Sequence, residues 1–253
     1  MDIHLVPAFN DNYIYLLHDA ERGTVGVVDP GDAAPVTAAL EQRGWRLTHI
    51  FNTHHHADHI GGNHALKQRY GCPVIGARAD AARIQDMDTP LDEGETVSFG
   101  SHTARVIAIP GHTSGHIAFH FADAKAVFCG DTLFALGCGR LFEGTPAQMW
   151  DSLRKLRALP DDTRVYCGHE YTLSNARFAV TVDPDNRTLA ARAGEVKALR
   201  SRGEPTIPST IGLEKRTNPF LRADDPAVQA AVGMAGTDPV AVFAEIRGRK
   251  DRF

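Results

Sequence analysis

The chain has 253 residues, of which 43% are hydrophobic and 23% charged, and its 27 Lys and Arg against 31 Asp and Glu give a formal net charge of −4. This composition is typical of a folded globular protein and excludes a disordered chain, a collagen-like repeat and a disulfide-dense mini-protein. The acidic balance disfavours nucleic-acid binding, and no apolar run approaches the ~18 residues of a membrane span. We therefore expect neither nucleic acid nor membrane as a partner.

The start of the chain and its cysteines indicate the compartment. The first residues lack the basic segment and apolar stretch of a secretory signal. The 4 cysteines form no C-x-x-C pair, so reduced thiols are favoured over disulfides. The sequence therefore predicts a cytoplasmic protein.

Strands and short loops dominate the first half of the chain. Runs of β-branched and aromatic residues, bounded by Asn, Asp, Pro and Gly turn signals, predict these strands. The predicted strands are residues 3–8, 13–18, 24–28, 47–52, 97–99, 105–109, 117–121 and 126–129, with helices at 34–42 and 61–69. Many strands with interspersed helices favour a layered α/β or α+β fold.

The second half of the chain is predicted to be mainly helical. Residues 145–148 have the form of a capping box with Pro146 at the first helical position, which predicts a helix ending near Pro160. A strand is predicted at 164–167, and helices at 175–180, 188–202, 227–234 and 239–246. We therefore predict a first domain over residues 1–172 and a helical second domain over residues 173–253.

A histidine-rich stretch, T-H-H-H-A-D-H at residues 53–59, follows one of the predicted strands. Alternate side chains of an extended chain share a face, so His54, His56 and Asp58 can converge, while His55 points elsewhere. The following turn brings His59 round to the same place. Neutral imidazole and carboxylate groups suit zinc, iron or manganese, so the stretch predicts a metal site.

Three distant segments each present a further metal-binding side chain beside a glycine, after a predicted strand. His112 lies in G-H-T-S-G-H, Asp131 in C-G-D-T and His169 in C-G-H-E-Y. Glycine lets the backbone turn sharply and approach a ligand closely, so these residues are natural additions to the first group. Together the side chains suffice for two metals, which leaves His116 a supporting role.

These four motifs, in this order, resemble those of the metallo-β-lactamase superfamily and, within it, most closely the glyoxalase II (hydroxyacylglutathione hydrolase) family. The resemblance spans nearly the whole chain and implies an α+β fold, an αββα sandwich followed by a helical domain that binds glutathione. It also implies two divalent metal ions, with zinc as first choice and iron or manganese as alternatives. The implied ligands are His54, His56 and His112 for one metal and Asp58, His59 and His169 for the other, with Asp131 bridging.

The activity implied by the resemblance is hydrolysis of S-(2-hydroxyacyl)glutathione, such as S-D-lactoylglutathione, to glutathione and a 2-hydroxy acid, here D-lactate. This reaction is the second step of methylglyoxal detoxification. A hydroxide bridging the metals would be the nucleophile, with Asp58 and Asp131 as the catalytic carboxylates that hold it. A thioester suits this chemistry because its thiolate leaves without strong acid assistance. A monomer acting on this small-molecule thioester is expected.

The resemblance also implies the substrate contacts. Arg140 and Phe142 lie in the segment G-C-G-R-L-F-E-G, and Tyr171 follows the last predicted metal ligand. Phe142 lacks the hydroxyl of the tyrosine found in some relatives. Arg247 and Lys250 are three residues apart, share a face if the last helix continues, and match an R-x-x-K pair for a glutathione carboxylate.

Several alternatives stay open on the sequence alone. A mononuclear iron dioxygenase acting on glutathione persulfide would use the same scaffold, and the full second set of ligands counts against it. A β-lactamase is less favoured because some such enzymes have cysteine where this chain has Asp131, and a nuclease should carry more basic charge. A non-catalytic binding module is disfavoured because structural zinc sites are usually closed by four ligands that include cysteine. The alternative for the basic C-terminus is a solvated charged face.

Overall fold

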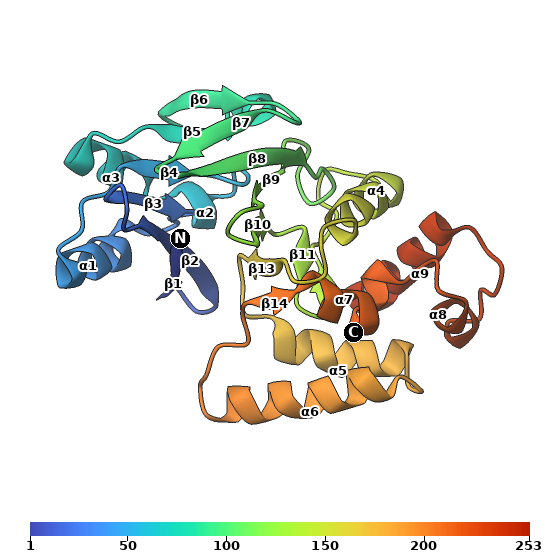
Figure 1. The fold of residues 1–253 in the computed structure, drawn as a ribbon. Helices are drawn as coiled ribbons and strands as arrows, with labels where there is room; N and C mark the ends of the chain where they lie inside the picture. Colours follow the sequence, from blue (N-terminus) through green and yellow to red (C-terminus); the bar gives the residue numbers. More distant parts are fainter. The chain divides into compact units, whose positions relative to one another are not determined.

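The computed structural model describes residues 1–253 and divides into two compact units (Figure 1). Unit 1 comprises residues 1–108 and 113–130, and unit 2 comprises residues 109–112 and 131–253. None of the helices combines the length and the apolar character that a membrane span needs.

Unit 1 is built from strands of two sheets. In the first sheet the order is β1-β2-β3-β4-β5-β6, with β1 to β3 antiparallel and β3 to β6 parallel. Strands β7 to β10 form an antiparallel meander in the second sheet. The bounds are β1 Asp2–Ala8, β2 Asn12–Asp19, β3 Thr24–Val28, β4 His49–Phe51, β5 Val74–Ala77, β6 Met87–Leu91, β7 Thr96–Phe99, β8 His102–Ala108, β9 Ile117–Phe121 and β10 Ala126–Gly130.

Helices cover one face of the first sheet, as Figure 1 shows for α1 and α3. Helix α1 begins where the Asp32 carboxylate accepts the Ala34 N–H at 2.9 Å, and it ends at Gly44 in the left-handed conformation. Its buried residues and Leu66 of α3 pack against Ile14 and other apolar side chains of the sheet. The helical elements of unit 1 are α1 Ala33–Arg43, α2 Ala57–Ile60, α3 Asn63–Tyr70 and η1 Arg78–Asp80.

Aromatic side chains fill the space between the two sheets of unit 1. Because side chains alternate along a strand, Tyr15 lies on the opposite face of β2 from its neighbours in the helix-covered core. The centroid of its ring lies 5.6 Å from that of Phe128. The ring centroid of Phe51 lies 5.9 Å from that of Phe99 and 5.2 Å from that of Phe119. The two sheets therefore form a sandwich.

Unit 2 combines short strands with helices. Helix α4 begins with the predicted capping box, in which Thr145 Oγ1 accepts the Gln148 N–H and Gln148 Oε1 accepts the Thr145 N–H. Helices α5 and α6 lie side by side (Figure 1), and Leu136 of the β11-β12 hairpin is buried in their shared core. The bounds are β11 Leu133–Phe134, β12 Gly137–Cys138, α4 Pro146–Arg157, β13 Arg164–Cys167, α5 Thr172–Val182, α6 Arg187–Ser201, β14 Ser209–Thr210, α7 Ile211–Thr217, η2 Pro219–Leu221, α8 Pro226–Ala231 and α9 Pro239–Asp251.

The elements predicted from sequence all occur, three of them (24–28, 117–121 and 164–167) with the predicted ends and the others with shifted ends, and the structure adds more. Strands β5 and β6 were not predicted, since β5 has only four residues and β6 contains Pro90, a residue that argues against a strand. Helix α7 and the two-residue strands β11, β12 and β14 are likewise too short for a periodic signal. The domain boundary between residues 172 and 173 stays a prediction.

Candidate metal centre

The predicted ligands of unit 1 follow strand β4, and we call His54, His56, Asp58 and His59 the first ligand set. The chain leaves the strand at Phe51 and enters α2 at Ala57, so a single turn brings the set together. His54 Nε2 lies 3.1 Å from His56 Nδ1, and His59 Nε2 lies 3.5 Å from Asp58 Oδ2. His54 and His59 are buried, so their nitrogens are largely removed from water.

A buried carboxylate that the sequence analysis missed, Asp29, braces this set. It follows β3, and its Oδ1 accepts the Thr53 N–H at 2.8 Å while its Oδ2 accepts the Thr53 hydroxyl at 2.7 Å. The same Oδ2 lies 3.2 Å from His59 Nδ1. A carboxylate only accepts hydrogen bonds, so it places the proton on Nδ1 and the ring lone pair on Nε2.

Asn12 and Gly31 hold Asp58 in a similar way. Asn12 Nδ2 donates to Asp58 Oδ2 at 2.9 Å and also approaches the Asp58 carbonyl at 3.3 Å. A Cβ atom at Gly31 would lie 1.9 Å from that carbonyl, so only glycine permits this approach of the two segments. Pro30-Gly31, a turn dipeptide shortly after β3, therefore also marks close packing at the ligand set.

The two remaining histidines of the motifs lie outside the ligand set. His55 Nδ1 lies 3.3 Å from Oδ2 of buried Asp80, so the side chain points to η1 as period 2 predicted. His116 is fully buried, and its ring stacks on His54 at 4.5 Å with an interplanar angle of 13°. This contact gives His116 the supporting position expected for it.

Unit 2 carries the other predicted ligands, His112, Asp131 and His169, which we call the second ligand set. Oδ2 of Asp131 lies 3.5 Å from His112 Nε2 and 3.2 Å from His169 Nε2. All three side chains are buried. The structure thus places one carboxylate between two imidazoles contributed by segments far apart in the sequence.

Backbone groups orient the rings of the second ligand set. The Arg140 carbonyl lies 2.9 Å from His112 Nδ1, which is the donor that leaves Nε2 directed at Asp131. Gly111 precedes His112 with φ 148°, and a Cβ there would lie 2.9 Å from the Met149 Cβ of α4. Burial raises the pKa of nearby Cys167 to about 12, so this residue is a small buried thiol and not a thiolate ligand.

Exposed aromatic rings pack on both histidines of the second ligand set. Phe142, 62% exposed, lies 5.2 Å from the His112 ring. Tyr171, 38% exposed, stacks on His169 at 4.7 Å with an interplanar angle of 2°. Two apolar surfaces therefore border the ligands in unit 2, as a substrate-binding face requires.

The predicted basic substrate residues gather in the same unit. Lys250 Nζ donates to the carbonyl and hydroxyl of Ser174, each at 3.2 Å. Burial lowers the pKa of Lys250, and the positive charges of Arg247 and Arg140 lower it further. Arg247 is only 5% exposed, and its Nε has no hydrogen-bond partner although its Nη1 donates to the Cys138 carbonyl. The structure thus brings three cations together, one of them almost fully buried.

The donor atoms of both sets fit divalent metal ions. Each set offers imidazole nitrogens and carboxylate oxygens and no thiolate, a combination that zinc, iron and manganese accept. Within unit 1, one ligand atom each from Asp29, His54 and His59 lies within 4.8 Å of the others. The oxygens of Asp29 already accept hydrogen bonds from Thr53, so its position suits an outer carboxylate better than a direct ligand.

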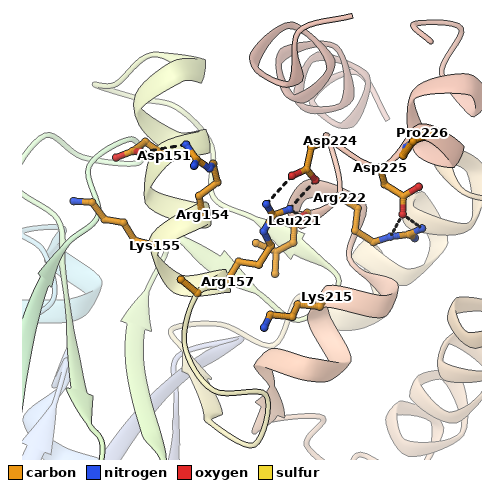
Figure 2. A pocket seen from close by; sticks show the side chains of 11 residues that line it. Asp151, Arg154, Lys155, Arg157, Lys215, Leu221, Arg222, Asp224, Asp225 and Pro226 are labelled. Carbon is orange, nitrogen blue, oxygen red and sulfur yellow. Dashed lines mark hydrogen bonds and ion pairs between the residues drawn. The ribbon is translucent and has the colours of Figure 1, made fainter. Parts of the chain in front are cut away.

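A separate charged hollow of unit 2, about 800 Å³ in volume, contains none of the predicted site residues (Figure 2). Arg157 forms a bidentate pair with Asp224 across it, at 2.7 and 2.6 Å. Arg222 pairs with Asp225, and Lys215 pairs with Asp161. Most of its charged side chains are therefore paired within the protein.

Comparison with known families covers almost the whole chain. Residues 9–169 match the family model described as the metallo-beta-lactamase superfamily, and residues 170–253 match the model described as the hydroxyacylglutathione hydrolase C-terminus. A hydroxyacylglutathione hydrolase of Rhodospirillum rubrum is 56% identical over 253 residues, which are 100% of this chain and 99% of the relative. One of Synechococcus sp. (strain JA-2-3B'a(2-13)) is 57% identical over 254 residues, covering 100% of both chains.

Solved structures support the same fold. The crystal structure of ETHE1 from Myxococcus xanthus matches with a TM-score of 0.68 and 26% identity, covering 99% of this chain and 98% of that one. The BLEG-1 B3 metallo-beta-lactamase matches with a TM-score of 0.67 and 22% identity, covering 87% of this chain and 99% of that one. The predicted αββα sandwich with a C-terminal helical domain is therefore confirmed as the fold class.

Proposed function

Because this chain belongs to the hydroxyacylglutathione hydrolase family of the metallo-β-lactamase superfamily, we propose that it hydrolyses S-(2-hydroxyacyl)glutathione thioesters at a divalent metal centre. S-D-lactoylglutathione is the expected substrate, and glutathione and D-lactate are the products. The observation that carries this proposal is the match over the full length, including the hydrolase-specific C-terminal model over residues 170–253. Relatives more than 50% identical are named as hydrolases, which favours hydrolysis over the dioxygenase alternative.

The first and second ligand sets are proposed to act together on two metal ions, with zinc as the first choice and iron or manganese as alternatives. The support is that one family model, over residues 9–169, spans all seven side chains. In this proposal His54, His56 and His112 hold one ion, and Asp58, His59 and His169 hold the other. Asp131 serves both, a role that agrees with its place between two imidazoles of unit 2.

Bound ions of this kind lower the pKa of water towards neutrality and polarise the attacked carbonyl group. The protein supplies the orientation. Asn12 fixes the Asp58 carboxylate, which would orient the attacking water, and Asp29 fixes the tautomer of His59. No further acid is needed, because the departing thiolate is a weak base.

The substrate is proposed to lie along the aromatic and basic groups of unit 2. Phe142 and Tyr171 offer exposed rings beside the second ligand set. Burial lowers the pKa of Lys250, and the positive charges of Arg247 and Arg140 lower it further. Asp251 pairs with Arg247 at 3.0 Å and with Arg140 at 4.0 Å, so these three cations share one carboxylate and keep an excess of positive charge. A glutathione carboxylate would compensate that charge. In this proposal Tyr171 and Phe142 contact the peptide, and the three cations fix its position by binding its carboxylate.

We also propose that the protein acts as a monomer in the cytoplasm. The support for a reducing compartment is that Cys72, Cys129, Cys138 and Cys167 are all buried and none of them forms a disulfide.

The proposal is tested by following loss of thioester absorbance from S-D-lactoylglutathione with the purified protein, while oxygen is recorded in the same cuvette. Release of one thiol per thioester lost, without oxygen uptake, is the expected result. Oxygen uptake with glutathione persulfide and no thioester hydrolysis would replace the proposal with the dioxygenase. Tight glutathione binding without turnover of any thioester would reduce the chain to a binding module.

A further inference from the structure

The β11-β12 hairpin of unit 2 is held by side chains far away in the sequence. It connects Asp131 to Arg140, and its Phe134 and Gly137 carbonyls both accept hydrogen bonds from Asn218 Nδ2, at 3.1 and 3.0 Å. The Leu136 N–H donates to Glu214 Oε2 at 2.9 Å. The tip of the hairpin is therefore bound by polar groups that come from α7 and its C-terminal end.

Two more side chains form hydrogen bonds with the hairpin. Asn175 of α5 donates to the Ala135 carbonyl at 3.1 Å, and Arg247 of α9 donates to the Cys138 carbonyl at 2.9 Å. Backbone polar groups of five successive residues, 134–138, thus bond to side chains of the C-terminal helices. A two-stranded ribbon is marginally stable alone, so these bonds decide its position.

The side chains that hold the hairpin are themselves fixed, because they are buried and hydrogen-bonded to one another. Glu214 Oε1 accepts from Arg192 Nη2 at 2.5 Å and also from the Ser209 hydroxyl. Glu214 Oε2 accepts from Asn218 Nδ2 at 3.0 Å. Glu214 and Asn218 are both fully buried, and Leu136 adopts a left-handed φ of 60° with its side chain in the α5-α6 core. A fully bonded buried network of this kind specifies one arrangement.

The hairpin leads directly to the second ligand set. The Gly139 N–H donates to the Thr132 carbonyl at 3.1 Å, which closes the segment next to Asp131. The Arg140 carbonyl orients His112, and the Phe134 ring packs edge-on against His169 at 6.0 Å. A displacement of the hairpin would therefore move the support of all three ligands at once.

We propose that Asn218 and Glu214 are positioning residues for the metal centre, acting through the hairpin on Asp131, His112 and His169. The C-terminal helical region then has a role in metal binding besides substrate binding. This inference rests on the proposed function only for its effect on catalysis, since metal affinity is measurable without substrate. Both side chains are fully buried and bond to backbone groups of the hairpin, so they are placed to act on the ligands through the hairpin.

The test compares Asn218→Ala with a matched control, Gln229→Ala, in the full-length protein. Gln229 is also buried in unit 2, donates to the carbonyls of Ala223 and Thr237, and accepts the Gly236 N–H. Asn218 likewise donates to two carbonyls of the hairpin and accepts the Phe220 N–H at 3.0 Å. Both variants therefore lose two bonds to carbonyls and one from a backbone N–H, and only those of Asn218 involve the hairpin. Asn218→Ala also loses the bond to Glu214 within the buried network.

The readouts are zinc affinity of the metal-free protein against a competing chelator, and kcat and KM for S-D-lactoylglutathione, well below the melting temperature. Asn218→Ala should weaken zinc binding ~10-fold or more, as loss of outer support does at metal sites. Its kcat should fall with it, while Gln229→Ala keeps the zinc affinity and kcat of the wild type. Equal zinc affinity and equal kcat in the two variants would overturn the proposal.

If Asn218→Ala does not fold, zinc affinity is measured on Asn175→Ala instead. This change is milder because it removes only the bond to the Ala135 carbonyl of the hairpin. A smaller loss of zinc affinity is expected, and an unchanged affinity would count against the proposal. A wild-type protein that binds zinc but hydrolyses no thioester would defeat the proposed function alone, since the zinc comparison would still be valid.

Discussion

Replacing Asp29 with asparagine should weaken metal binding much more than it weakens the fold. The Thr53 N–H can only donate, so the new amide oxygen must stay at Oδ1, 2.8 Å away in the wild type. The amide NH2 group then replaces Oδ2, which lies 3.2 Å from His59 Nδ1. Two donors would face each other unless His59 moves its proton to Nε2, where it blocks a metal.

The magnitude follows from the loss of this carboxylate–histidine contact. Loss of such a partner typically costs about 10- to 100-fold in metal affinity, or about 1.4–2.7 kcal/mol. The bond from the Thr53 N–H is kept, and the Thr53 hydroxyl, which donates to Oδ2 in the wild type, must instead accept from the new NH2 group. The free energy of unfolding of the metal-free protein should therefore fall by no more than about 1–3 kcal/mol.

The assay is zinc titration of the metal-free protein against a competing chelator, with Asp32→Asn as the matched control. Asp32 makes the same charge change, but its carboxylate only caps α1, accepting the Ala34 N–H, and asparagine caps equally well. The control should bind zinc like the wild type. Equal zinc affinity in Asp29→Asn and Asp32→Asn would refute the tautomer reasoning.

Three further outcomes are expected. Asp131→Asn should lower the metal content at both positions, by elemental analysis, and a variant with two metals and normal turnover would exclude the bridging role. Because the pKa of Lys250 is lowered from 10.5 by burial, Arg247 and Arg140, its charge is lost early as pH rises. Lys250→Ala should therefore raise KM more than it lowers kcat. The variant should also bind S-methylglutathione more weakly than the wild type, by a factor that shrinks as pH rises. A ratio of the two dissociation constants, variant to wild type, that stays constant with pH would contradict this. Phe51→Ala should lower the free energy of unfolding by about 3–5 kcal/mol in urea titrations, and a loss below about 1 kcal/mol would show that the sheets pack without it.

The clustering of the first ligand set could be predicted from sequence because its information is local. Four donor side chains lie within residues 54–59, and the two-residue period of the strand distinguishes His55 from its neighbours. The capping box of α4 is local in the same sense. In both cases the structure follows from bonds within one turn of chain.

Asp29 could not be assigned in this way, because it lies 24 residues from Thr53 in the chain. The parallel pairing of Val28 with Phe51 brings the two strand ends together, and no local pattern specifies that register. A carboxylate directly after a buried strand and before Pro30-Gly31 was the one available signal. The hydrogen bonds from Asn218 to the hairpin join residues 81 and 84 positions apart in the sequence, and no local pattern indicates them.

For Arg247, the sequence predicted the helix face on which the side chain lies but not how deeply it is buried. The predicted helix does continue to Asp251, so Arg247 and Lys250 share it as expected. The sequence could not predict that Arg247 would be buried under the Cys138 carbonyl and over the Phe220 ring. Such burial depends on packing between distant elements, which is why its role in substrate binding stays a proposal.

The most direct test of metal-dependent thioester hydrolysis is to remove the metal and restore it. The protein is stripped with a chelator, and hydrolysis of S-D-lactoylglutathione is measured as zinc is added, with bound metal determined on the same samples. Activity should vanish in the stripped protein and return in proportion to zinc, reaching its plateau at about two ions per chain. Full thioesterase activity in protein shown to hold no metal would contradict the proposed chemistry.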